Sequence, residues 1–210
     1  TCVAEINRLH AAGADIVRVA VPERKDTQAL KEILPQVSVP IVADVHFHFQ
    51  RALEAVEAGV HKIRLNPGNI KDRPKVERVI AACRERSIPI RVGANEGGIV
   101  ERQDKSTRAE EKAALDLDYR GQMSAIMVEK LEEYLRIFSD NDFYDVVLSA
   151  KSVDPQIVLS SYSECSRRFD YPLHLGVTHA GPPETGRIRS VVALGALLAQ
   201  GIGDTIRVSL

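Results

Sequence analysis

The sequence predicts an α/β protein of the (β/α)8 TIM-barrel class, with strands and helices alternating around a parallel sheet. Two observations lead to this prediction. Short runs rich in β-branched residues alternate with helical patterns along all 210 residues. In addition, three similar junctions, "HAAGADIVRV", "VEAGVHKIRL" and "LAQGIGDTIRV", each contain a glycine that ends a helix shortly before a strand begins. Such regular spacing is typical of quasi-repeated βα units.

Almost every expected strand follows a helix-ending glycine or a turn proline. Gly13, Gly59 and Gly201 precede the first, third and last strands, the prolines of "SVPIVA", "SIPIRV" and "DYPLHL" open three more, and Asp145 begins the fifth as a turn or cap residue. The expected strands are Ile16–Val21, Ile41–His46, Lys62–Asn66, Ile88–Asn95, Asp145–Lys151, Pro172–His179 and Asp204–Leu210. The expected helices are Cys2–Ala12, Thr27–Leu34, Arg51–Ala58, Pro74–Arg86, Lys112–Phe138, Gln156–Arg168 and Gly186–Gln200.

A complete barrel has eight strands and eight helices, whereas this chain opens in a helix and closes on a strand. We therefore expect the first strand and the last helix to be missing, so that residues 1–210 form a single TIM-barrel domain of a longer protein. The alternative is a seven-stranded or open α/β sheet. The polar stretch Asn95–Lys112 follows a strand and is expected to be a loop on the C-terminal face of the barrel.

Composition limits the classes of function. The net charge of -1 and the pI of about 6.6 imply no bulk attraction to nucleic acid or to an anionic membrane. No apolar run is long enough to span a bilayer. Cys2, Cys83 and Cys165 are far apart and form no C-x-x-C motif, so neither a zinc site nor a cluster site can be read from them. Free thiols favour a reducing, cytoplasmic compartment.

Four expected strands carry an arginine between two apolar residues, near the C-terminal end of the strand. Alternate residues of a barrel strand face the helices and the interior. If the apolar neighbours pack under the helices, the arginines point inward at the end of the barrel where active sites form. These arginines are Arg18, Arg64, Arg91 and Arg207.

Several buried guanidiniums need anions to neutralise them, and the strands supply few. Asp44 is the one carboxylate clearly at the C-terminal part of a strand, so one arginine could pair with it. The others match phosphate oxygens, so we expect the barrel mouth to bind a strongly anionic small molecule such as a diphosphate. In the alternative, some arginines lie on the outer face or pair with glutamates from loops. Asn66, Asn95 and Ser209 share the parity of the arginines and are expected nearer the mouth.

Other polar residues end neighbouring strands. Lys151 faces inward if Ser149 does, and there it could bind phosphate or act as an acid, with the arginines lowering its pKa. His179 precedes a Gly/Pro-rich loop and is a candidate proton donor. His174 is expected to pack in the middle of its strand.

A competing interpretation is a metal-dependent barrel hydrolase. Asp44, His46 and His48 share one face of "ADVHFHFQ", and His179 could complete a metal site with them. The neighbouring arginines would repel a cation, so we expect no metal at these residues.

The motifs "AGADIVRVAVP", "VADVHF", "IRLNPGN", "IRVGAN", "LHLGVT", "AGP…GRIRS" and "GIGDTIRVSL" follow one another along the whole chain. Together they resemble the 4-hydroxy-3-methylbut-2-enyl diphosphate synthase family of the methylerythritol phosphate pathway of isoprenoid biosynthesis. The resemblance implies a TIM-barrel domain of an oxidoreductase that opens the ring of 2-C-methyl-D-erythritol 2,4-cyclodiphosphate reductively and removes a hydroxyl group. It also implies two electrons from ferredoxin or flavodoxin, passed through a 4Fe-4S cluster, and a homodimer in which one subunit's cluster domain caps its partner's barrel.

By this resemblance, the arginines and lysine hold the diphosphate, while asparagine and serine side chains add neutral hydrogen bonds. Catalytic roles are expected for Asp44, Lys151 and His179. The family usually has a glutamate acid after "GVT", where this chain has His179, and it often reads H-F-D where this chain has His48. The expected substrate-binding residues are Arg18, His46, Arg64, Asn66, Arg91, Asn95, Lys151, Arg207 and Ser209.

The cluster ligands of the family, three cysteines and a glutamate, lie in a C-terminal domain that this sequence lacks. Cys2, Cys83 and Cys165 do not match those ligands. We therefore expect the chain alone to hold no cofactor, to bind substrate weakly and to be inactive. A third hypothesis is a non-catalytic diphosphate-binding module that senses phosphorylated metabolites.

Overall fold

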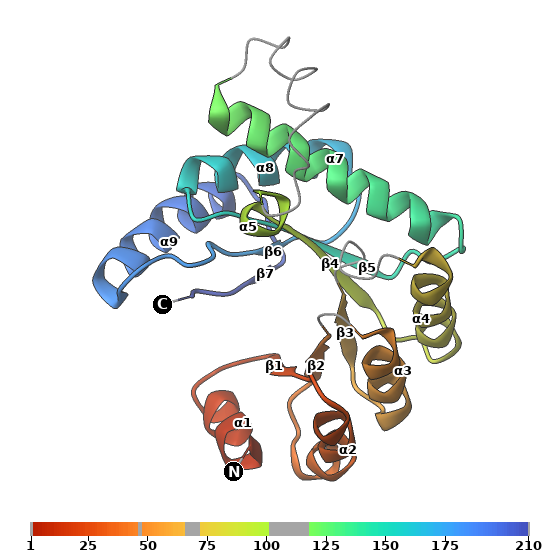
Figure 1. Ribbon diagram of the computed structural model, residues 1–210. Coiled ribbons are helices and arrows are strands. Elements are labelled where there is room, and N and C mark those ends of the chain that lie inside the picture. Colours follow the sequence, from red (N-terminus) through yellow and green to blue (C-terminus); the bar gives the residue numbers. More distant parts are fainter. Residues whose placement is uncertain (1, 46–47, 66–71, 101–117, 210) are drawn as a thin grey trace. The chain divides into compact units, whose positions relative to one another are not determined.

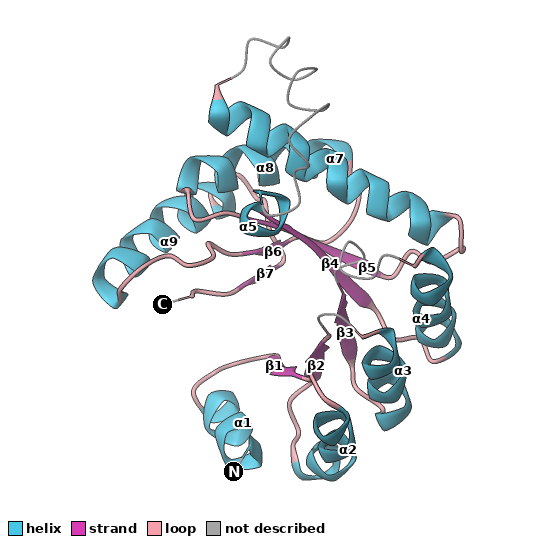
Figure 2. Cartoon of the chain, viewed as in Figure 1, coloured by secondary structure: helices cyan, strands magenta, loops and turns pink. Residues whose placement is uncertain are grey.

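The computed structural model describes residues 2–45, 48–65, 72–100 and 118–209. They form two compact units, one of Thr1–Val92 with Arg136–Val146 and the other of Gly93–Leu135 with Val147–Leu210. In both, strands alternate with helices along the chain (Figures 1 and 2). The predicted α/β class is therefore confirmed, whereas the assignment of residues 1–210 to one domain stays a prediction. No helix in the described ranges is long and apolar enough to cross a membrane.

The first unit is built on parallel strands that are hydrogen-bonded to one another in chain order. The register places Asp44 opposite Arg64, and Arg64 opposite Arg91, so that charged residues lie side by side on neighbouring strands. The strands are β1 (Val17–Ala20), β2 (Ile41–Asp44), β3 (Lys62–Leu65) and β4 (Ile90–Asn95), of which β4 continues into the second unit. The helices are α1 (Cys2–Ala11), α2 (Arg24–Ile33), the 3-10 helix η1 (Leu34–Gln36), α3 (Phe49–Ala58) and α4 (Arg73–Glu85).

In the first unit, a glycine ends a helix shortly before a strand begins, as the sequence predicts. Helix α3 ends at Gly59, whose φ of 90° lies in the left-handed region that glycine adopts at little cost. Strand β3 then begins three residues later, and Ile63 and Leu65 are fully buried in it. Each such side chain contributes roughly 1.5–3 kcal/mol to stability by leaving water. The core therefore fixes which face of β3 carries Arg64.

The second unit contains the end of β4 and three further strands. Strand β6 (His174–Leu175) pairs in parallel with β7 (Thr205–Ile206), and Leu148 of β5 (Val146–Lys151) bridges to Leu173 just before β6. The hydroxyl of Tyr162 donates a buried hydrogen bond of 2.6 Å to the carbonyl of His174, which fastens a helix to β6. The helices are α5 (Glu96–Val100), α7 (Tyr119–Ser139, which ends in the first unit), α8 (Pro155–Arg168) and α9 (Pro183–Leu198).

All seven expected strands occur, but two are much shorter than predicted. β6 and β7 have only two residues each. Just before β6, the amide of Leu173 donates to the side chain of Asp204 and not to a backbone carbonyl of β7. The predicted loop Asn95–Lys112 is wrong at its start, since α5 begins at Glu96. Residues 101–117 lie outside the described residues, as do His46 and Asn66.

Candidate active site at the carboxyl ends of the strands

In the first unit, Asp44 holds two arginines. Arg18 Nη1 lies 2.8 Å from Asp44 Oδ2, and Arg64 Nη1 donates to Asp44 Oδ1 over 3.3 Å. The Asp44 side chain is 4% exposed, that of Arg64 is 10% exposed and that of Arg18 is 37% exposed. We expected one arginine to pair with this carboxylate. The structure adds a second, so a single buried anion orients two guanidiniums.

Arg64 and Arg91 lie next to each other on β3 and β4 and are both buried. Their apolar neighbours Ile63, Ile90 and Val92 are fully buried, which confirms the predicted burial of the flanking residues on these strands. Because side chains alternate along a strand, the two arginines share the opposite face. Two guanidiniums therefore stand side by side on adjacent parallel strands. Arg64 precedes the last residue of β3, whereas Arg91 is the second residue of β4, so the prediction that each arginine lies near the C-terminal end of its strand is wrong for Arg91.

A further cation on this face was missed by the sequence reasoning. Lys62 is two residues before Arg64 and therefore shares its face of β3. Burial, and then the charge of Arg91, lower the pKa of the Lys62 ammonium. The parity rule that selected Arg64 selects Lys62 as well, but Lys62 opens the strand and so lies farther from its C-terminal end.

In the second unit, Lys151 is buried at the end of β5, beside Gly176, which directly follows β6. A Cβ added at Gly176 would lie 3.1 Å from Lys151 Nζ and 2.9 Å from the carbonyl oxygen of Arg207. On the preceding strand, a Cβ at Gly93 would lie 2.5 Å from Ser149 Oγ. The missing side chains of Gly93 and Gly176 leave the space that Ser149 and Lys151 occupy.

Arg207 is exposed, and its Nη2 donates to Ser209 Oγ over 2.8 Å. Two predicted site residues therefore lie in direct contact. The predicted burial of the neighbours of Arg207 is wrong, since Ile206 is 54% and Val208 48% exposed. β7 pairs with β6 on one side, and no helix among the described residues of this unit buries these two side chains.

The two histidines of the expected strand Pro172–His179 lie in different surroundings, since β6 contains His174 and ends before His179. The predicted packing of His174 is confirmed, and the role of His179 as a proton donor stays a prediction. His174 is buried, and its Nδ1 lies 2.8 Å from Thr205 Oγ1, so it is packed within the strand pair. His179 is exposed and has a φ of 48°, a left-handed conformation that is uncommon for a residue with a side chain. Such backbone positions are frequent at functional sites.

Asp44 and His48 are the described members of the proposed metal site in the first unit. His48 is exposed and precedes α3 as its N-cap residue. Within the ranges that the structure describes, no three His, Cys, Asp or Glu residues come together as a metal site would require.

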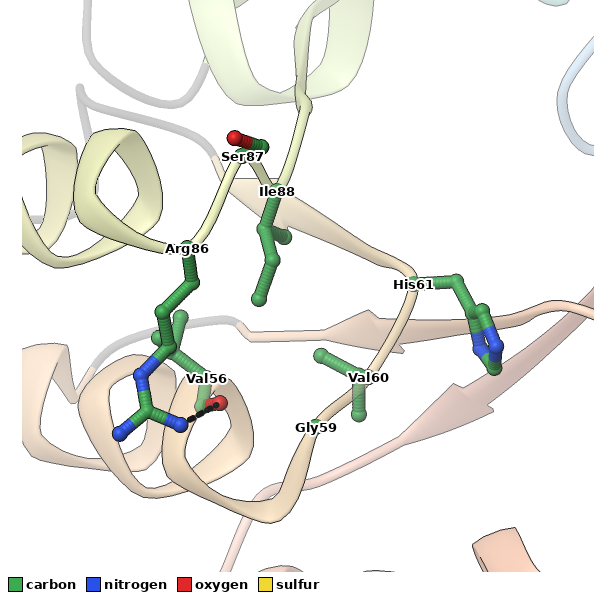
Figure 3. Close-up of a pocket in the computed structure, with 7 residues that line it drawn as sticks. All are labelled: Val56, Gly59, Val60, His61, Arg86, Ser87 and Ile88. Atoms are coloured by element: carbon green, nitrogen blue, oxygen red, sulfur yellow. Dashed lines mark hydrogen bonds between the residues drawn. The ribbon is translucent and has the colours of Figure 1, made fainter.

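An open pocket lies at the opposite, amino-terminal ends of β3 and β4 (Figure 3). Its volume is about 570 Å³, and Arg86, one of its lining residues, donates a hydrogen bond of 3.4 Å to the carbonyl of Val56. In barrels this rim serves stability rather than chemistry. The lining residues are Val56, Gly59, Val60, His61, Arg86, Ser87 and Ile88.

A sequence model of one protein family, the GcpE TIM-barrel domain, matches residues 1–210. The chain belongs to this family. The predicted resemblance and the predicted TIM-barrel class are thereby confirmed. Among solved structures, the chain is similar to dihydropteroate synthase of Yersinia pestis, with a TM-score of 0.61 and 14% identity over 98% of this chain and 80% of that one. It is also similar to a putative phosphonomutase of Burkholderia cenocepacia, with a TM-score of 0.53 and 12% identity over 95% of this chain and 89% of that one. These two likenesses concern the fold alone.

Curated relatives of this GcpE domain have one name in common. The chain is 47% identical over 208 residues to the 4-hydroxy-3-methylbut-2-en-1-yl diphosphate synthase (flavodoxin) of Exiguobacterium sibiricum, covering 99% of this chain and 53% of that protein. It is 45% identical to the protein of the same name from Geobacillus kaustophilus, covering 99% and 52%. The GcpE domain therefore spans about half the length of these relatives.

The cysteines of this GcpE domain do not fit an iron–sulfur cluster. Cys83 and Cys165 are buried, and burial raises the pKa of each thiol from 9.0 to about 12. Cluster ligands are thiolates, which need the opposite shift. Cys2 is exposed on α1. No step of a reaction can therefore be assigned to a cluster held by these three residues.

Proposed function

We propose that this chain is the substrate-binding barrel of an iron–sulfur oxidoreductase of isoprenoid biosynthesis. The substrate is 2-C-methyl-D-erythritol 2,4-cyclodiphosphate and the product is 4-hydroxy-3-methylbut-2-enyl diphosphate. The name shared by the relatives supports this reaction, with flavodoxin as electron donor. The family resemblance implies an iron–sulfur cofactor, 4Fe-4S in type, held outside this chain, and a homodimer. Free thiols at Cys2, Cys83 and Cys165 fit a cytoplasmic location.

The main support for this function is that two guanidiniums, on the strands that flank β2, share the single buried carboxylate of β2. Asp44 pairs with Arg18 and Arg64, and Arg91 lies next to Arg64 in the register. Like charges placed side by side repel each other, and the repulsion is large where water is scarce. A doubly phosphorylated ligand would relieve it, because each guanidinium fork matches two phosphate oxygens.

Each residue class has a distinct task in this proposal. Arg64 and Arg91 bind phosphate oxygens, while Asp44 keeps Arg64 oriented before the ligand arrives. Lys151 and Arg207 bind further phosphate oxygens by charge. Ser209 and Asn95 donate neutral hydrogen bonds, and His46 and Asn66 complete the set. His179 supplies a proton near the reacting carbon, in the place where the family usually has a glutamate.

Calorimetric titration with the cyclodiphosphate tests this proposal. Arg64→Ala or Arg91→Ala should weaken binding by at least about 1.5 kcal/mol, because a hydrogen bond to a charged group is lost. Arg73→Ala, which removes an exposed arginine paired with Glu77 and Asp140, is the matched control and should leave the affinity unchanged. Unchanged affinity in both site variants would remove these arginines from the substrate site.

Two further measurements separate this proposal from its alternatives. Stoichiometric zinc or manganese in the purified protein that disappears when the histidines are substituted would favour a hydrolase. A full-length protein with no cluster-ligand cysteines would favour a binding module without chemistry. The proposal predicts instead that added salt lowers affinity for the cyclodiphosphate, although less than it would for a site on the surface.

A further inference from the structure

The carboxyl ends of β4 and β5 are joined by a side-chain hydrogen bond that the proposed reaction does not use. Ser152 Oγ donates to Glu96 Oε2 over 2.5 Å. Glu96 directly follows Asn95, the last residue of β4, and Ser152 directly follows Lys151, the last residue of β5. The bond therefore links the residues next to two proposed ligand-binding side chains.

Ser152 is fully buried and is bonded on three sides. Its hydroxyl accepts a hydrogen bond of 2.9 Å from the amide of Asp154 while it donates to Glu96. Its carbonyl accepts a hydrogen bond of 3.0 Å from the amide of Thr178, the residue before His179. Ser152 thus connects the residues next to Asn95, Lys151 and His179.

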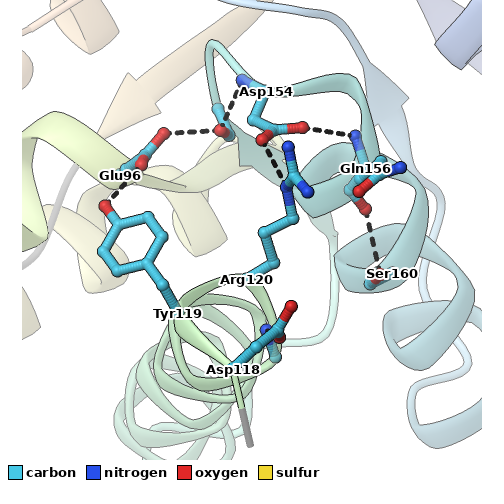
Figure 4. Close-up of polar contacts among 9 residues, drawn as sticks. Glu96, Asp118, Tyr119, Arg120, Asp154, Gln156 and Ser160 are labelled. Atoms are coloured by element: carbon cyan, nitrogen blue, oxygen red, sulfur yellow. Dashed lines mark hydrogen bonds and ion pairs between the residues drawn. The ribbon is translucent and has the colours of Figure 1, made fainter.

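The first two residues of α7 bond to the side chains of Glu96 and Asp154 (Figure 4). The Tyr119 hydroxyl donates to Glu96 Oε1 over 2.9 Å, and Arg120 Nε donates to Asp154 Oδ2 over 2.7 Å. Tyr119 is 60% exposed and Arg120 is also exposed, so their bonds are weaker than the buried bond of Ser152. The hydroxyl of Ser152 is therefore the central contact and the Tyr119 hydroxyl a peripheral one.

We propose that Glu96 and Ser152 are positioning residues that fix Lys151 and Asn95 for binding the phosphate groups of the ligand. This inference rests on the proposed function. A lysine has a long flexible stem, so the place of its ammonium depends on a fixed backbone and on limited free space. The space is set by Gly176, and the backbone next to Lys151 is fixed by Ser152.

The charge of Glu96 suits this role. A hydroxyl bonded to a carboxylate makes a shorter and stronger hydrogen bond than one bonded to a neutral group. Ser152 is buried, so a lost partner cannot be replaced by water without rearranging the strand end. Removing either side chain should let β5 end in more than one conformation, and the Lys151 ammonium would move with it.

The test is a calorimetric titration of the full chain with the cyclodiphosphate, together with thermal unfolding. Ser152→Ala removes one oxygen and should weaken binding about five-fold, the equivalent of one hydrogen bond. Glu96→Ala should have a similar effect, whereas Glu96→Gln keeps an acceptor oxygen and should bind within about two-fold of the wild type. Tyr119→Phe is the matched control, since it removes only the exposed bond to Glu96, and should also stay within about two-fold.

Measuring the effect of Ser152→Ala on affinity in the Lys151→Ala variant distinguishes a role in positioning from a merely structural role. If Ser152 acts through Lys151, then Ser152→Ala added to Lys151→Ala should change the affinity by less than about two-fold, because coupled residues are not additive. An equal loss in both backgrounds would overturn the inference, as would unchanged affinity in Ser152→Ala. Should Ser152→Ala fail to fold, Glu96→Ala takes its place in the same cycle.

The inference and the proposed function fail in different ways. If the wild-type chain binds the cyclodiphosphate and Lys151→Ala weakens binding, while Ser152→Ala and Glu96→Ala do not, then the proposed function stands and only the positioning role is overturned. A wild-type chain that binds no cyclodiphosphate overturns both.

Discussion

The two compact units hold their cations by different means. In the first, the buried carboxylate of Asp44 orients Arg18 and Arg64. In the second, Lys151 fits into space left by Gly176, and Arg207 contacts the neutral hydroxyl of Ser209. A guanidinium is a flat fork whose orientation matters, whereas an ammonium is a point charge that needs only a fixed place. The first unit therefore orients its arginines by charge, whereas the second unit positions its lysine by shape.

The largest loss of stability is expected at Asp44. Asp44→Ala leaves Arg64 buried without this carboxylate and should lower the free energy of unfolding by about 3 kcal/mol. Urea denaturation measures the change. Asp140→Ala, which removes an exposed partner of Arg73, is the control and should cost less than about 1 kcal/mol. Equal effects of the two variants would show that the carboxylate is not central to the first unit.

Shape is tested in the second unit by Gly176→Ala. The new methyl group would meet the carbonyl of Arg207 at 2.9 Å and Lys151 Nζ at 3.1 Å. Since the backbone carbonyl cannot easily move, we expect a loss of about 1–3 kcal/mol in the free energy of unfolding. Gly195→Ala in α9 is the control, because nothing lies within 4 Å of its added Cβ, and it should stabilise the chain by up to about 1 kcal/mol. A Gly176→Ala variant as stable as wild type would contradict the role of this glycine.

Each unit also buries one thiol, which gives a pH-dependent test of both cores. The folded pKa of Cys83 and of Cys165, about 12, is above the ordinary value of 9.0. Stability from this source is complete below pH 9 and is lost as the pH rises towards 12, by about 1 kcal/mol for each thiol at pH 10.

Thiol labelling measures the same protection at neutral pH. A thiol reagent should react with the exposed Cys2 of the native chain and reach Cys83 and Cys165 only after unfolding. In Cys2→Ser, the native chain should therefore show almost no reaction. Rapid labelling of that variant would mean that at least one unit opens readily.

The smallest effect is expected at Arg207. Because this side chain is exposed, Arg207→Ala should change the free energy of unfolding by less than about 0.5 kcal/mol. Arg64→Ala should cost clearly more, since it leaves the buried Asp44 with one arginine fewer. Similar stability losses in the two variants would remove the distinction between the units.

Sequence patterns predicted those parts of the site that depend on alternation along one strand. Arg64 and Arg91 lie on the face opposite their buried neighbours Ile63 and Val92, as parity requires. The same rule was wrong for the neighbours of Arg207, because alternation does not say whether another element covers a strand. Ile206 and Val208 are exposed for that reason.

Contacts between strands could not be predicted in the same way. The sharing of Asp44 by two arginines depends on the register of β1, β2 and β3, which no local pattern encodes. The bond from Ser152 to Glu96 joins residues 56 positions apart in the sequence. The one clue in the sequence was that each residue directly follows a predicted strand, because the carboxyl ends of adjacent parallel strands meet at one edge of the sheet.

A crystal structure of the chain with the cyclodiphosphate bound would show which side chains hold the ligand. We expect phosphate oxygens within hydrogen-bonding distance of the guanidiniums of Arg64 and Arg91, with Asp44 still bonded to Arg64. An ordered ligand elsewhere, with both guanidiniums contacting protein groups alone, would contradict this expectation.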